Sequence, residues 1–180
     1  MAIEIEHKFL IKNNTWRMHV KNRVFIRDGL IFTKKSGKMR IRIYSDKAFL
    51  TIKTKKILNY RDEYEYEIPV SDANKIIDLN SDGRIIEKYR NYIQNGDHCW
   101  EIDEYKGLLE GIVIAEIELK SSNEVFEKPD WVGKEITNDD RFRVINMIDE
   151  KIIQNWEEKK FKQNKEILGE YLFPEFYKYN

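Results

Sequence analysis

Charged residues alternate with their neighbours along the first segment of this chain, where Glu4, Glu6 and Lys8 are separated by Ile5 and His7. Successive side chains of a β-strand point to opposite faces, so this segment predicts a strand with two acids and one base on the same face. The carboxylates of such a face could bind a hard divalent cation, and the ammonium group could bind an anion held by that cation. A solvated edge strand is the other interpretation, because charged residues cover most exposed strands.

The same alternation recurs along the chain, and it gives each predicted strand one charged face. These faces hold Arg40, Arg42 and Tyr44; Thr51, Lys53 and Lys55; Glu63, Glu65 and Glu67; Lys88 and Arg90; Glu101 and Asp103; and Glu116, Glu118 and Lys120. The sequence Asn-Gly-Asp at 95–97 is typical of a tight turn and joins two of these segments into a predicted hairpin.

Glutamates that lie side by side on one strand face repel one another unless cations lie beside them. If the strands are neighbours in one sheet, ladders of salt bridges between acidic and basic strands would neutralise the charges. If the sheet closes into a barrel, the charged faces line an interior cavity and the apolar faces pack outward under helices. That cavity would need water, metal ions and a polyanion, because unpaired charges are costly to bury.

Composition favours a single domain over residues 1–180, because a chain of this length buries a sizeable core. The first 60 residues carry 15 basic and 4 acidic side chains and the rest carry 17 and 28, so the two parts attract each other. A net charge of zero argues against nucleic-acid binding, and the three histidines lack metal-ligand spacing. Cys99 is the only cysteine and no apolar run approaches the roughly 20 residues that span a bilayer, so we expect a soluble cytoplasmic protein without a disulfide.

Helices are expected over 15–20, over 71–78 with Ser71 as the N-cap, and from 139–140 to about 168. The last of these carries an apolar stripe formed by Phe142, Ile145, Ile148, Ile152 and Trp156. This stripe predicts an amphipathic helix that covers the outside of the sheet. Residues 150–180 form a helical and aromatic C-terminal extension, which could dock on the barrel or on a second subunit.

In their order, these segments resemble the CYTH domain of the triphosphate tunnel metalloenzyme family, from about residue 2 to residue 148. The Glu-x-Glu-x-Lys pattern that opens the family is matched by Glu4, Glu6 and Lys8. The later matches are Arg40 with Arg42, Thr-Ile-Lys ending at Lys53, the acidic strand 61–69, Lys88 with Arg90, and the segments 100–103, 115–119 and 131–135. A single motif of this kind is weak, whereas the ordered series is specific.

The resemblance implies an α+β fold in which about eight antiparallel strands close into a β-barrel that forms a tunnel, with helices packed outside. It also implies that carboxylates hold Mg²⁺ or Mn²⁺ while basic side chains bind a triphosphate. The implied metal ligands are Glu4, Glu6, Asp103, Glu116 and Glu118, with Glu63 or Glu65. The implied substrate-binding residues are Lys8, Arg40, Arg42, Lys53, Lys88, Arg90 and Lys134, of which Lys8 and Lys53 are also candidate catalytic residues. The proton of the attacking water could go to Lys53, if its surroundings lower its pKa, or to a metal-held carboxylate.

The leading functional hypothesis is metal-dependent removal of the terminal phosphate from inorganic triphosphate, with weaker action on nucleoside triphosphates. The alternatives are an adenylyl cyclase of the kind found in this family, a thiamine triphosphatase, and a module that binds polyphosphate or nucleotide without turnover. One departure is visible at Asp28, Gly29 and Leu30, where close relatives often read Gln-Gly-Tyr, so a tyrosine near the tunnel is missing. The family's habit of pairing and the aromatic tail are consistent with a homodimer.

Overall fold

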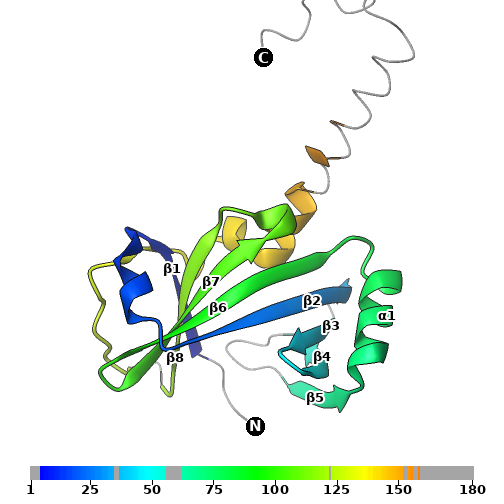
Figure 1. The fold of residues 1–180 in the computed structure, drawn as a ribbon, viewed down its shortest axis with the longest axis horizontal. Helices are drawn as coiled ribbons and strands as arrows, with labels where there is room; N and C mark the ends of the chain where they lie inside the picture. The colour runs from blue at the N-terminus through cyan, green and yellow to red at the C-terminus, as the bar shows by residue number, and fades with distance from the viewer. Residues whose placement is uncertain are drawn as a thin grey trace, which may run out of the picture.

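The computed structural model describes residues 5–34, 37–55, 62–121, 123–151, 154–155 and 158. In these ranges, nine strands form one antiparallel sheet in the order β5-β4-β3-β2-β6-β7-β8-β1-β9, which Figure 1 shows strongly twisted. The strands are β1 (Ile5–Ile11), β2 (Asn22–Lys34), β3 (Gly37–Tyr44), β4 (Lys47–Thr54), β5 (Glu63–Ile68), β6 (Ile85–Asn95), β7 (His98–Lys106), β8 (Val113–Leu119) and β9 (Val132–Glu135). The predicted antiparallel sheet with few helices is confirmed. Within the described ranges no ladder joins β5 to β9, so closure into a barrel stays a prediction.

Short helices connect the strands, and one longer helix packs on the sheet. The connecting 3₁₀ turns are η1 (Asn14–His19), η2 (Gly107–Leu109) and η3 (Asp140–Phe142). Helix α1 (Val70–Asn80) begins before Ser71, so the prediction that Ser71 is its N-cap is wrong. The fixed φ of Pro69, at −58°, already suits entry into a helix, and the Ser71 hydroxyl donates to Asp72 instead. No helix among the described residues is both long enough and apolar enough to span a bilayer.

The apolar face of the sheet carries most of the core. Phe9 on β1, Trp100 on β7 and Ile117 on β8 are buried there with Trp16 of η1 and Trp131, which precedes β9. Helix α1 covers another part of this face, next to β2, β3 and β4 (Figure 1). Phe9, Trp100 and Ile117 are thus covered on this face, while the charged residues that alternate with them point to the opposite face.

The C-terminal helix lies at a different place from the one predicted. Residues 144–151 are helical, and Met147 and Ile148 pack with Ile86 and Ile114, whose registers put them on the same face as the charged residues. The expectation that this helix covers the outside of the sheet is therefore wrong. It fills one end of the charged side, because the strands end there in apolar rather than charged residues. Ile152 and Trp156 lie outside the described residues.

Candidate functional site

The pairing registers bring the predicted site residues together on one face of the sheet, called here the charged face. Residues directly opposite each other are Lys8 and Glu116, Arg90 and Asp103, Asp28 and Arg42, and Lys53 and Glu63. Partners in such a register point their side chains to the same side. Asp103, Lys88 and Glu116 are 0%, 5% and 5% exposed. A flat sheet would leave such side chains in water, so their burial indicates that the sheet curls around the charged face.

Asp103 is the centre of this face. Its carboxylate accepts two hydrogen bonds of 2.7 Å from the Arg90 guanidinium and pairs with the ammonium group of Lys88. Arg90 also donates to Glu116 at 2.8 Å and pairs with Glu101. Burial alone would raise the pKa of Asp103, but Lys88 and Arg90 hold it well below its ordinary value. The salt-bridge ladders considered as an alternative are thus present on this face.

The acidic part of the charged face lies where β1 and β8 meet. The Lys8 ammonium group lies 2.5 Å from Glu116 and 3.1 Å from Glu6, so one cation serves two carboxylates. Burial, followed by repulsion from Glu116, raises the pKa of Glu6 to about 7. Burial alone would lower the pKa of Lys8, but both carboxylates raise it above its ordinary value. In this arrangement Lys8 supplies a fixed positive charge.

The basic part of the charged face lies on β2, β3 and β6. Arg42 donates from Nε and Nη2 to the two carboxylate oxygens of Asp28, both at 2.7 Å. Arg40 lies two residues away on the same strand face, with its Nη1 4.0 Å from Asp28. Its Nε is buried and has no hydrogen-bond partner in the part of the chain that the structure describes. These guanidinium groups form a cationic surface beside the buried Lys88.

Lys53 lies towards the β5 edge and not in the central cluster. It is buried, and its ammonium group lies 2.8 Å from the exposed Glu63. The neighbouring Glu65 is also exposed and accepts a hydrogen bond of 3.0 Å from the hydroxyl of Thr51. These two glutamates are therefore separated from the carboxylates around Asp103 by several strands.

Besides the residues near β5, Glu118 and Lys134 also lie away from the central cluster. Glu4 lies outside the described residues. Glu118 is on the charged face opposite Glu6 but is exposed. Lys134 is exposed on the edge strand β9, next to Glu135, which pairs with His7 at 2.8 Å on the other side of the sheet. Lys134 is thus at the margin of the charged face.

Sequence reasoning left four charged-face residues out of the site. Asp28 and Glu101 pair with Arg42 and Arg90, and the hydroxyls of Tyr44 and Tyr92 lie 3.1 Å apart across β2. The sequence could have placed Tyr44 and Glu101 in the site, because each continues an alternating pattern of charged residues. The sequence does not place Asp28 in the site, because apolar residues occur on both faces of β2 and the alternation of polar and apolar residues is not visible there.

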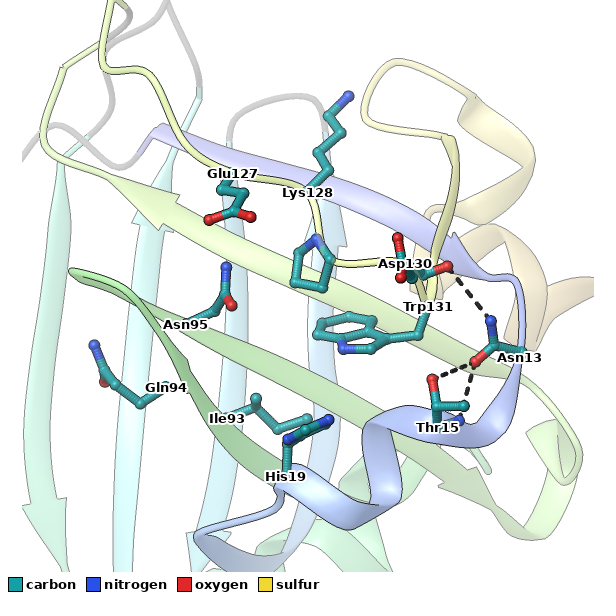
Figure 2. A pocket seen from close by; sticks show the side chains of 11 residues that line it. Asn13, Thr15, His19, Ile93, Gln94, Asn95, Glu127, Lys128, Asp130 and Trp131 are labelled. Carbon is teal, nitrogen blue, oxygen red and sulfur yellow. Dashed lines mark hydrogen bonds between the residues drawn. The ribbon is translucent and has the colours of Figure 1, made fainter.

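A hollow of about 560 Å³ lies on the apolar side of the sheet, away from the predicted site residues. Figure 2 shows Asn95, Glu127 and His19 around it, with Trp131 beside Ile93. Ile93 alternates with Tyr92 along β6, so the hollow and the charged face lie on opposite sides of the same strand. The volume of this hollow does not make it the chemical site, because the buried ion pairs lie on the other side.

The carboxylates of the charged face suit a hard divalent cation. Within the described ranges, no three acidic, histidine or cysteine side chains form a ready ligand cluster. The acids of the charged face are paired with Lys8, Lys88 and Arg90. Burial and, after it, repulsion from Glu116 nevertheless raise the pKa of Glu6. A divalent cation would relieve this repulsion, and carboxylate oxygens are its preferred ligands, so the donor set fits such an ion.

Comparison with known proteins identifies the family. The family model of the CYTH domain matches residues 2–145. The chain belongs to the CYTH family. An inorganic triphosphatase of Acetivibrio thermocellus is 43% identical over 148 residues, which cover 82% of this chain and 94% of that protein. An inorganic triphosphatase of Nitrosomonas europaea is 30% identical over 145 residues, which cover 78% and 93%.

Solved structures of other proteins share the fold. A crystal structure of an inorganic triphosphatase matches with a TM-score of 0.63 at 28% identity, covering 82% of this chain and 95% of the other. A Hippeastrum protein, first assigned as a candidate adenylyl cyclase and described as having a dominant triphosphatase activity, matches with a TM-score of 0.50, covering 66% of this chain and 80% of the other. At 15% identity, this second match shows the fold alone.

Proposed function

We propose that this CYTH protein is a metal-dependent inorganic triphosphatase whose substrate binds along the charged face. The observation that carries the proposal is the division of this face into an acidic part around Glu6 and Glu116 and a basic part around Arg40 and Arg42. The near relative in Acetivibrio thermocellus, an inorganic triphosphatase, supports the same substrate. A linear polyanion that carries a divalent cation needs both parts.

In this proposal the acidic part holds Mg²⁺ or Mn²⁺. Glu6 and Glu116 are the proposed ligands, with Glu4, Glu118 and Asp103 as the further candidates, while Glu63 and Glu65 contribute from the β5 side. The ion would offset negative charge on the phosphates and orient the attacking water. With those carboxylates committed to an ion, the Lys8 ammonium group, which pairs with both of them in this structure, would be available to contact phosphate oxygens.

The basic part positions the phosphates. Arg40, Arg42 and Arg90 offer planar forks that match phosphate oxygens, and the buried ammonium groups of Lys53 and Lys88 supply compact charge. Lys134 is proposed as a contact at the margin. Closure of the sheet into a tunnel would bring β1 and β8 opposite β3 and β4, so that both parts act on one substrate.

Phosphate release from inorganic triphosphate and from ATP, each measured with Mg²⁺, with Mn²⁺ and with EDTA, tests the proposal. We expect release that requires metal and strongly favours inorganic triphosphate. Glu6→Gln should lower kcat/KM at least about 100-fold, because loss of a metal ligand weakens both the charge stabilisation and the orientation of the attacking water that the ion would supply. Glu127→Gln, on the other side of the sheet, is the matched control and should keep full activity.

Two other results would contradict the proposal. Cyclic AMP and pyrophosphate as the main products from ATP would identify a cyclase. Binding of triphosphate without release of phosphate under any metal condition would identify a binding module.

A further inference from the structure

Asp28 takes the place on Arg42 that a phosphate would use. The two carboxylate oxygens of Asp28 accept from Nε and Nη2 of Arg42, both at 2.7 Å, which is the paired geometry that arginine also offers to phosphate. Asp28 is 3% exposed and lies in the middle of β2 on the charged face. This contact is therefore part of the site and not a surface ion pair.

The backbone around Asp28 is held in place. A Cβ atom on the next residue, Gly29, would lie 2.8 Å from Cγ1 of Ile77, so α1 packs directly against β2 at this point. Asp28 consequently has little freedom to withdraw from Arg42 by a shift of the strand.

The charged groups that act most strongly on Asp28 are cationic. Arg42 contacts it directly, Arg40 lies 4.0 Å away and Lys88 adds a weaker attraction. Burial alone would raise the pKa of Asp28, but these cations hold it below its ordinary value, so the carboxylate is charged at neutral pH.

Arg40 differs from Arg42 although both lie on the same face of β3. The fork of Arg42 is occupied, whereas the Nε of Arg40 is buried without a hydrogen-bond partner among the described residues. A buried donor without an acceptor is costly, so an incoming phosphate oxygen gains more from Arg40 than from Arg42.

We propose that Asp28 limits the affinity of the site for phosphate anions by competing with them for Arg42. A phosphate group must displace Asp28 before it can form hydrogen bonds with Arg42. Whether or not it does so, the negative charge of Asp28 repels it. Weak retention of anions favours release of the shorter phosphate products. The inference rests on the proposed function only in taking inorganic triphosphate as the ligand.

The test is the dissociation constant of inorganic triphosphate, measured by calorimetry in EDTA so that no turnover occurs. Asp28→Asn keeps the shape and removes the charge, and it should bind triphosphate roughly 10- to 100-fold more tightly, as expected for releasing one charge-assisted contact. Asp78→Asn is the matched control, because Asp78 pairs with Arg27 at 2.7 Å away from the charged face, and its affinity should stay within about twofold of wild type.

A second comparison does not depend on the folding of Asp28→Asn. In the wild-type background, Arg40→Gln should weaken triphosphate binding several-fold more than Arg42→Gln, because Asp28 accepts two hydrogen bonds of 2.7 Å from Arg42 and lies 4.0 Å from Arg40. Equal losses from these two variants, or unchanged or weaker binding by a folded Asp28→Asn, would overturn the inference while leaving wild-type hydrolysis intact. A wild-type protein that neither binds nor hydrolyses triphosphate would refute the proposed function, and this inference with it.

Discussion

Removing Arg90 should lower the free energy of unfolding far more than removing an arginine on the other side of the sheet does. Arg90 donates to Asp103 and Glu116, which are 0% and 5% exposed, so Arg90→Met leaves two buried carboxylates short of a partner. Breaking a buried ion pair from one side typically costs about 3–5 kcal/mol. We expect a loss of this size in the free energy of unfolding at pH 7.

Arg27→Met is the comparison variant. Arg27 lies 2.7 Å from Asp78, whose side chain is 57% exposed, so its removal should cost under about 1 kcal/mol. Urea unfolding in EDTA, followed by the fluorescence of the four tryptophans, measures both losses. If Arg90→Met cost no more than Arg27→Met, the charged face would be hydrated like a surface, and the reasoning from burial would be refuted.

Three further changes have expected outcomes. Glu104 is held below its ordinary pKa by hydrogen bonds from Arg17 and Asn91 despite its burial, so Glu104→Gln should be less stable than wild type at pH 7. The stability difference between wild type and this variant should shrink as the pH falls through the lowered pKa that Glu104 has in the folded protein. Urea midpoints of both proteins at pH 7 and at acid pH measure it, and an equal difference at the two pH values would contradict the prediction. Gly29→Ala should lower Tm, at a cost of about 1–3 kcal/mol, because the new methyl group meets Ile77, and an unchanged Tm would mean that α1 moves freely. Ile148→Ala should lower the free energy of unfolding by about 2–5 kcal/mol, measured with urea, because Ile148 is fully buried at the end of the charged face. A small loss would mean that this helix lies on the surface.

The alternation of charged and apolar residues was enough to predict most strands and the face of each that carries the site. The turn between β6 and β7 was also predicted, and Gly96 adopts the φ of +57° that such a turn requires. Alternation does not state which strands become neighbours. Lys8 and Glu116 are 108 residues apart in sequence, and only the register of β1 and β8 brings them within 2.5 Å.

Two features could not be found from sequence periodicity. The 13-residue strand β2 has apolar residues on both faces, because Ile26 is buried on the charged side while Gly29 packs under α1, so its period of two is hidden. The apolar stripe near Ile148 predicted a helix correctly but not its position. An amphipathic pattern shows that a helix has a buried face, and it does not identify the surface that buries it.

The position of β1 has a consequence for how the protein folds. The first strand pairs with β8 and β9, so the chain must bring its N-terminal segment against residues 113–135. Closing so long a loop is slow, because its entropy cost comes before its contacts form. The hairpin of β6 and β7 joins neighbouring segments and can form early, whereas Glu6 and Lys8 meet Glu116 only when β1 pairs with β8. During synthesis on the ribosome, the acidic end of the site therefore cannot form before β8 has been made.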